Sequence, residues 1–257
     1  MTAITVKNVW KDYGEQRVLE RVNLTVREKA FCSIVGASGC GKSTFLRILL
    51  GQENQTRGTI TLDNHPLPVD PSVDRGIVFQ RYSVFPHLNA VENVALGIEL
   101  QRSALLGRLF GSARKAALDE AQLYLAAVGL DHAMDKYPAE LSGGMQQRLA
   151  IAQALIKKPK VLLLDEPFGA LDPGIRGDMH ELITKLWDEN DMTVFMVTHD
   201  IEEGFKLGTR MLVFDKVRID PDAPGAFGAT ITYDIPLSKK SNGELKDLHN
   251  LELKKKD

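Results

Sequence analysis

The chain has 257 residues, of which 44% are hydrophobic and 26% are charged, and its formal net charge is -2. This length and composition support one large domain or two small ones with a sizeable core, and they argue against a disordered chain. The balanced charge gives no reason to expect a nucleic-acid partner, and we interpret the basic run Lys254–Lys256 as a solvated chain end.

The N-terminal residues and the cysteines indicate the compartment. Residues Met1–Lys7 contain no charged leader followed by an apolar signal core, and no apolar run is long enough to span a bilayer. We therefore expect a cytosolic protein that reaches a membrane only through a partner. Cys32 falls in a predicted buried strand and Cys40 in a glycine-rich loop, so a structural disulfide is not expected.

Strand patterns dominate the first third of the chain. Apolar residues predict strands at Ile4–Val9, Val22–Val26, Phe31–Val35, Ile60–Leu62 and Gly76–Phe79. Turn residues stand at Tyr13–Glu15 and Asp63–Pro66, and Pro66–Pro71 is expected to be a loop.

Helical periodicity replaces these patterns from about residue 89 to residue 156, with a loop at Leu141–Gly144 and helix resuming at Met145. Strand patterns return at Val161–Leu164 and Thr193–Val197, and a helix is predicted between them over Arg176–Glu189. Pro221–Gly225 reads as loop, and Thr230–Leu237 alternates as an edge strand does.

Residues 101–116 are amphipathic and locally basic. Such a segment is either a surface for lipid headgroups or a partner, or an exposed helix of the helical region. We favour the exposed helix.

The most specific motif is Gly36–Thr44, which reads GASGCGKST between the apolar runs Phe31–Val35 and Phe45–Leu50. A strand, a glycine loop and a helix in this order form the context of a phosphate-binding loop. Glycines let backbone N–H groups close around phosphate oxygens, and the helix points its positive dipole end at the anion. The expected nucleotide contacts are Gly36, Ala37, Ser38, Gly39, Cys40, Gly41, Lys42, Ser43 and Thr44.

Within this loop, Lys42 can reach the β- and γ-phosphates, and the Ser43 hydroxyl can ligate Mg²⁺. The patterns together predict an α/β fold. It consists of a P-loop NTPase core, with a mixed sheet and antiparallel N-terminal strands, and an inserted α-helical subdomain. We expect the core at about 1–88 and 157–215, the helical subdomain at about 89–156, and a C-terminal strand with a charged tail at 216–257.

A second anion site is predicted at Leu141–Arg148, which reads LSGGMQQR. Ser142, Gly143 and Gly144 supply a hydroxyl and backbone N–H groups where a helix begins. One chain with one phosphate loop has no evident use for a second γ-phosphate site. Two copies that sandwich two nucleotides head to tail would use both sites.

With these motifs in this order, the chain resembles the ATP-binding cassette (ABC) ATPases over roughly residues 3–215. The usual family pattern LSGGQ reads LSGGM here, with Met145 in the fifth position. The resemblance implies ATP and Mg²⁺ as ligands, a RecA-like core, hydrolysis of ATP to ADP and phosphate, and a homodimer.

The polar residues that follow the later strands fit this resemblance. Asp165, at the end of an apolar strand, can hold Mg²⁺, and Glu166 can then orient or deprotonate the attacking water. By resemblance, His199 is the switch histidine at the γ-phosphate, and Gln80 contacts Mg²⁺ and the water. The expected catalytic residues are therefore Lys42, Gln80, Glu166 and His199, and the expected metal ligands are Ser43, Gln80 and Asp165.

Two further residues are assigned by the resemblance. Tyr13 matches the aromatic residue that stacks on adenine, although an aromatic residue in a turn can also serve packing. Asp172 ends Gly169–Asp172, which resembles the loop that crosses the dimer interface.

The segment Arg81–Leu88 has apolar residues after Gln80. In the family this surface receives the membrane partner, and the alternative is a loop packed on its own helical subdomain. We expect permease subunits to contact Tyr82–Leu88, with a solute-binding protein as an indirect partner.

The resemblance is strongest to importer ATPases of the nitrate, sulfonate, taurine and bicarbonate group. It implies a motor on the inner face of the bacterial plasma membrane that powers uptake of a small solute. An exporter or lipid-trafficking motor, and a non-transport ABC ATPase, are the alternatives.

A further hypothesis concerns the reactivity of the Cys40 thiol. This residue lies two positions before Lys42 near a helix N-terminus, where the pKa of a thiol tends to fall. We expect alkylation of Cys40 to inhibit the ATPase and MgATP to protect it.

Overall fold

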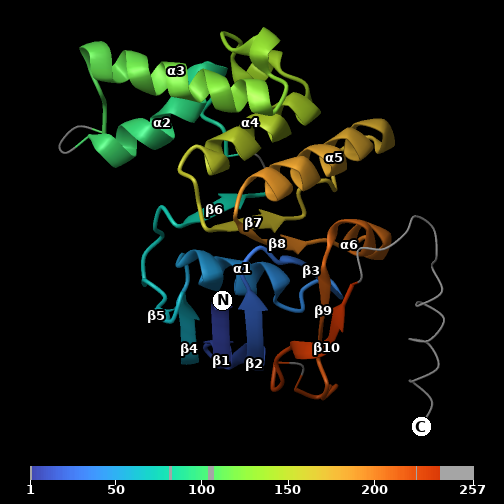
Figure 1. Cartoon of the computed structure of the whole chain (residues 1–257). Coiled ribbons are helices and arrows are strands. Elements are labelled where there is room, and N and C mark those ends of the chain that lie inside the picture. Colours follow the sequence, from blue (N-terminus) through green and yellow to red (C-terminus); the bar gives the residue numbers. More distant parts are fainter. Residues whose placement is uncertain (1, 81–82, 104–106, 224, 238–257) are drawn as a thin grey trace.

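The computed structural model describes residues 2–80, 83–103, 107–223 and 225–237. The strands form two sheets, and helices cover them (Figure 1). The described part of the chain contains no helix with both the length and the apolar character needed to cross a membrane.

The first sheet is antiparallel, with strand order β2-β1-β4-β5. Strands β1 (Thr2–Tyr13) and β2 (Gln16–Arg27) form a long hairpin, and β4 (Arg57–Leu62) and β5 (His65–Pro66) complete the sheet. The predicted turn is confirmed, because Tyr13 pairs with Gln16 and Gly14 takes a positive φ of 58° that suits glycine. Strand β1 runs four residues beyond the predicted end at Val9, since cross-strand pairing continues to Tyr13.

The second sheet has the order β10-β9-β3-β8-β7-β6. Its central strands are β3 (Phe31–Gly36), β8 (Thr193–Val197) and β7 (Val161–Asp165), flanked by β6 (Arg75–Val78) and β9 (Arg210–Asp215). These five strands run parallel to one another, so their carboxyl ends meet at one edge of the sheet. Strand β10 (Thr230–Pro236) pairs antiparallel with β9 and forms the predicted edge strand.

The central strands are apolar throughout because both of their faces are buried. Leu162 and Leu164 point into a core shared with the helical region, whereas Val161 and Leu163 point into a second core on the opposite face. The second core also contains helix α1 (Lys42–Leu50) and the inner residues of the antiparallel sheet. The alternation within one strand thus joins two packed layers across the sheet.

Three long helices lie together at the top of Figure 1: α2 (Ala90–Arg102), α3 (Gly111–Ala127) and α4 (Gly143–Leu155). Short 3₁₀ turns at Asp131–Ala133 and Pro138–Glu140 connect α3 to α4. Helices α5 (Pro173–Glu189) and α6 (Ile201–Leu207) follow strands of the parallel sheet. The exact division at 88 and 157 between core and helical subdomain stays a prediction.

Three expectations about helix limits are wrong. Helix α5 begins at Pro173 rather than Arg176, because proline suits the first position of a helix, where its missing N–H would have no partner. Helix α4 begins at Gly143 rather than Met145, because the Ser142 side chain accepts the Met145 N–H and caps the helix there. The segment 101–116 is not one exposed helix. Arg102 ends α2 and Gly111 begins α3, while residues 104–106 lie outside the described chain.

Candidate active site

The site lies at the edge where the parallel strands end. The loop from Gly36 to Gly41 leaves the central strand β3 and enters helix α1. Gly36, Gly39 and Gly41 all have positive φ values, of 151°, 75° and 93°. A β-carbon on Gly36 would lie 2.1 Å from the Phe214 carbonyl oxygen, so only glycine fits between this loop and strand β9.

The Lys42 side chain, only 7% exposed, folds back over the loop. Its Nζ donates hydrogen bonds to the carbonyl oxygens of Gly36 and Ala37, both at 2.8 Å. These bonds hold the ammonium group above the loop that the sequence predicts to bind phosphate. Ala37, Ser38 and Gly39 are exposed, so the outer face of the loop is open to a ligand.

Ser43 and Asp165 bring a hydroxyl and a carboxylate together at this edge. Ser43 Oγ donates to Asp165 Oδ1 at 2.9 Å. Burial raises the pKa of Asp165, and the nearby charge of Glu166 raises it further, while the Ser43 hydrogen bond opposes the shift. A carboxylate in this position gains from a cation.

This donor pair fits Mg²⁺ as the sequence predicts. Magnesium prefers hard oxygen ligands and is commonly held by one or two carboxylates together with substrate phosphates. No group of three or more His, Cys, Asp or Glu residues able to hold a metal occurs among the described residues. Ser43 and Asp165 would therefore hold Mg²⁺ together with oxygens supplied by a nucleotide and by water.

Glu166 lies at the centre of a second contact group. Its Oε2 accepts a hydrogen bond from Gln80 Nε2 at 2.9 Å, and His199 Nδ1 lies 3.8 Å from the same oxygen. The backbone of Glu166 has a φ of 47°, unusual for a residue with a side chain and typical of strained functional positions. The three residues that the sequence proposes around the attacking water are thus gathered at one carboxylate oxygen.

Tyr13 comes from the antiparallel sheet and is 44% exposed. Its hydroxyl donates to Glu53, and Lys11 Nζ lies 4.6 Å from the centre of its ring. Burial and the bond to Glu53 raise the pKa of Tyr13, and a hydrogen bond from Thr44 of the phosphate loop opposes the shift. Tyr13 therefore lies beside the loop, as an adenine platform requires, and Glu53 is an anchor that the sequence analysis missed.

The second predicted anion site is separate within one chain. Ser142 caps α4, and both Ser142 and Gly143 are exposed. In the described ranges, no hydrogen bond or ion pair joins Ser142, Gly143 or Gly144 to the phosphate loop. Asp172, at the start of α5, is also exposed and its side chain makes no capping hydrogen bond.

The expectation for Cys40 is wrong in its chemistry. The thiol is only 5% exposed, and burial raises its pKa despite the opposing charge of Lys42. The low-pKa rule for helix N-termini fails here because the side chain points into the core, where a thiolate is poorly solvated.

Three other polar residues escaped the sequence analysis: the buried Asn93, His180 and Glu203. Asn93 binds the loop before α2, donating to Phe85 and Leu88 carbonyls and accepting the Phe85 N–H at 2.7 Å. The spacing of Asp200 and Glu203, typical of a helix start, would have predicted α6, and Asp200 does cap that helix. No local pattern predicts the pairing of His180 with Glu203.

Comparison with known families decides the classification. Residues 19–169 match the ABC transporter family. The chain belongs to this family. The resemblance inferred from the motifs and the α/β fold class are both confirmed.

Among curated relatives of this ABC chain, the nitrate import ATP-binding protein NrtD of Synechocystis sp. is 40% identical over 87% of this chain and 78% of its own length. The bicarbonate transport ATP-binding protein CmpC of Synechococcus elongatus is 40% identical over 92% of this chain. The chain spans about a third (34%) of the length of that CmpC.

Solved ABC cassettes have the same fold. The dimeric, post-hydrolysis structure of the ATP-binding cassette MJ0796 bound to ADP and Pi is 32% identical, with a TM-score of 0.73. That match covers 92% of this chain and 100% of the MJ0796 chain.

Proposed function

We propose that this chain is the ATP-hydrolysing subunit of an ABC importer and works as a head-to-tail homodimer beneath permease subunits. The observation that carries the proposal is the meeting of Gln80, Glu166 and His199 at one oxygen, beside the Ser43–Asp165 pair. Dimeric MJ0796 with ADP and Pi supports both the hydrolysis and the pairing.

ATP would bind along the outer face of the phosphate loop. Backbone N–H groups and Lys42 would neutralise charge on the phosphates, with Lys42 Nζ exchanging its two carbonyl partners for phosphate oxygens. Tyr13, held by Glu53, would stack on adenine. Mg²⁺ held by Ser43, Asp165 and the phosphates would supply the positive charge that stabilises the transition state.

Glu166 is then the residue that orients the attacking water and accepts its proton. Gln80 holds the Glu166 carboxylate by a hydrogen bond at 2.9 Å, and His199 Nδ1 lies 3.8 Å from the same carboxylate oxygen. General-base residues of this kind contribute about 10²–10⁴-fold to the rate. We expect the Glu166→Gln substitution to preserve ATP binding while it removes the base.

The exposed Ser142, Gly143 and Asp172 supply the remaining half of each site in the partner copy. Because these groups lie apart from the phosphate loop of their own chain, one copy leaves the nucleotide uncovered. Two copies would close over two nucleotides, and hydrolysis would release them. The conformational work comes from the difference in ATP affinity between the open and closed pairs.

The permease would bind at the loop that precedes α2. Tyr82 lies outside the described residues, but Phe85 is 43% exposed and borders a cavity of about 300 Å³ with Leu88, Leu96 and Leu100. Because Asn93 holds this loop to α2, the surface is firm enough to receive a helix of a partner. The chain would thus work at the inner face of the plasma membrane through its partner.

The cargo we propose is a small solute such as nitrate or bicarbonate, as in the names of NrtD and CmpC. A binding protein and the permease, rather than this chain, would select it.

The deciding experiment is size-exclusion chromatography with light scattering on Glu166→Gln, with and without MgATP, together with ATPase assays of the wild-type chain. We expect hydrolysis by the wild type, and a shift of the variant from monomer to dimer that retains ATP. Glu189→Gln, an exposed change at the end of α5, is the matched control and should hydrolyse ATP normally. A Glu166→Gln chain that binds ATP but stays monomeric alone and with its co-expressed permease would contradict the paired-site mechanism.

A further inference from the structure

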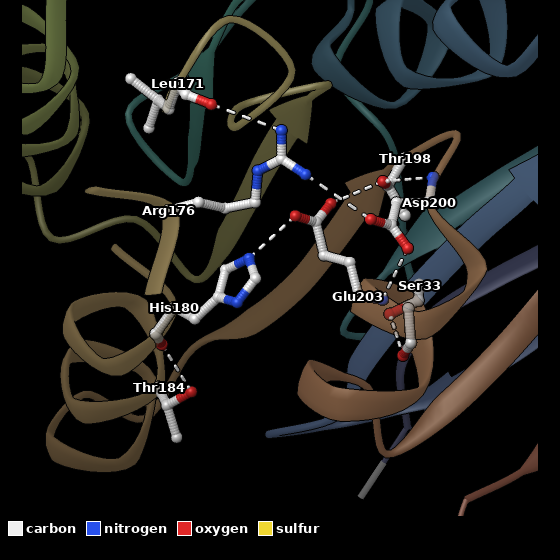
Figure 2. A network of polar contacts seen from close by, with 9 residues as sticks. Ser33, Leu171, Arg176, His180, Thr184, Thr198, Asp200 and Glu203 are labelled. Atoms are coloured by element: carbon white, nitrogen blue, oxygen red, sulfur yellow. Dashed lines mark hydrogen bonds and ion pairs between the residues drawn. The ribbon is translucent and has the colours of Figure 1, made fainter. Parts of the chain in front are cut away.

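Helix α5 presents two basic side chains, one turn apart, to Asp200 and Glu203 (Figure 2). Arg176 lies in the first turn of α5, and His180 follows in the next turn. Both reach residues at the start of α6 rather than solvent. The helix that begins at Asp172 is therefore tied to the segment that follows strand β8.

The inner tie is the pair His180 and Glu203, whose side chains are only 8% and 5% exposed. His180 Nε2 lies 2.8 Å from Glu203 Oε1. The other ring nitrogen of His180 has no hydrogen-bond partner among the residues that the structure describes, so Glu203 alone orients the ring by polar contact. The Phe168 ring packs against the imidazole, with ring centres 4.9 Å apart.

Glu203 also connects, through Thr198, to the backbone beside His199. Its second oxygen accepts the Thr198 hydroxyl at 2.5 Å, and Thr198 Oγ1 in turn accepts the Asp200 N–H at 3.0 Å. Thr198 and Asp200 are the two neighbours of His199 in the chain. Glu203 therefore holds both sides of the turn from which the exposed His199 side chain projects.

The stability of the fold alone does not require the buried His180–Glu203 pair. Burying a carboxylate and an imidazole is expensive, and well-packed apolar residues often replace such pairs without loss of stability. Within the part of the chain that the structure describes, each hydrogen bond of the Glu203 carboxylate leads either to α5 or to the turn carrying His199. His199 in turn lies 3.8 Å from Glu166.

We propose that Glu203, oriented by His180, is a positioning residue that fixes His199 at the Glu166 carboxylate and links this position to helix α5. The inference rests on the proposed role of His199 in ATP hydrolysis. Arg176 adds an outer tie. Its guanidinium donates to the Leu171 carbonyl at 3.4 Å and pairs with Asp200 at 3.7 Å. A displacement of the exposed Asp172 segment would thus be passed to His199.

The test is steady-state ATP hydrolysis by the full chain carrying Glu203→Ala or Glu203→Gln. Because Glu203→Ala removes the link without touching the nucleotide, kcat should fall about tenfold or more with KM for MgATP almost unchanged. Glu203→Gln keeps an oxygen for Thr198 and should recover most of kcat. In a His199→Ala background, Glu203→Ala should cause no further loss, since both changes remove the same function.

Two other variants keep the test decisive if Glu203→Ala fails to fold. Thr198→Val removes only the hydroxyl and should lower kcat, whereas Thr198→Ser should retain it. Ser33→Ala is the matched control, because the buried Ser33 hydroxyl donates to the carbonyl of Gly204, next to Glu203, at 2.9 Å. This control should lower the melting temperature and leave kcat unchanged.

The outcomes separate this inference from the proposed function. A wild-type chain that hydrolyses ATP, with His199→Ala impaired but Thr198→Val and Glu203→Ala at normal kcat, would overturn the positioning role alone. Losses that multiply in the double variant would also overturn it, because Glu203 would then act independently of His199. Normal kcat in His199→Ala would overturn both the role of His199 and the inference built on it.

Discussion

Gln80 and Glu166, 86 positions apart in the chain, are joined by a hydrogen bond in which Gln80 Nε2 donates to Glu166 Oε2 at 2.9 Å. The bond crosses from the end of β6 to the end of β7, two neighbouring parallel strands. It connects the segment leading to the helical region with the candidate catalytic base. The position of the helices can therefore affect the orientation of Glu166.

Gln80→Glu should impair hydrolysis more than Gln80→Ala. The glutamate places a second carboxylate against Glu166, and the two acids can share the contact only if one of them takes up a proton. We expect kcat to fall about 10-fold for the alanine variant and about 10²-fold for the glutamate variant at neutral pH. Equal losses, measured in parallel ATPase assays, would mean that the bond to Glu166 has no role in orienting it.

The Asp165→Asn substitution should maintain or raise the stability of the nucleotide-free protein while weakening the effect of MgATP. Burial raises the pKa of Asp165 above its value in the unfolded chain, so ionising this group lowers the stability of the folded state. This loss of folded-state stability is absent below the pKa of Asp165 in the unfolded chain, which is about 4. It is complete above the pKa of Asp165 in the folded protein. At pH 7 without nucleotide, the variant should melt at the wild-type temperature or up to about 4 °C higher, and the difference should vanish towards pH 4.

The same variant should lose the stabilisation that MgATP confers, because the amide is a poor ligand for Mg²⁺. Asp119→Asn, an exposed change on α3, is the control and should change neither property. Thermal scans with and without MgATP measure both effects. A lower melting point for nucleotide-free Asp165→Asn at pH 7 would show that the Ser43 contact outweighs the burial of the charge.

Two glycines of the phosphate loop should respond differently to alanine. A β-carbon at Gly36 would lie 2.1 Å from the Phe214 carbonyl oxygen, whereas one at Gly39 would have no atom within 4 Å. Gly39→Ala should therefore cost only the strain of its positive φ, about 1–2 kcal/mol. Gly36→Ala should lose about 3 kcal/mol or more in urea unfolding. Equal losses would mean that backbone conformation, rather than contact with β9, restricts both positions.

Both thiols should react slowly in the folded protein. Burial raises the pKa of Cys40, and it raises that of Cys32 to about 12. Because the thiolate is the reacting form, iodoacetamide at pH 8 should label both far more slowly than a free cysteine. Cys40 should become reactive first as the pH rises. Mass spectrometry distinguishes the two sites, and rapid labelling of Cys40 that MgATP prevents would restore the original hypothesis of an activated thiol.

Much of this protein can be predicted from local patterns. The phosphate loop can be predicted because its glycines, Lys42 and Ser43 are close together in the sequence. Their chemistry depends on local backbone conformation and on a helix terminus. The central strands can be predicted because burial on both faces requires continuous apolar runs such as Val161–Leu164. The helix limits near Ser142 and Gly111 are harder to predict from the sequence, since a single capping side chain or a short loop decides them.

Contacts between segments far apart in the chain set the features that local patterns do not predict. Cys40 has the local surroundings of an activated thiol, yet its side chain packs into the core, and desolvation reverses the expected shift of its pKa. His180 and Glu203 carry no local signal, because a buried imidazole and a buried carboxylate are stable only when folding brings them together. Contiguous motifs were enough to predict the phosphate loop and to identify the family. Packing determined which of these groups are exposed, which are paired, and which hold the others in place.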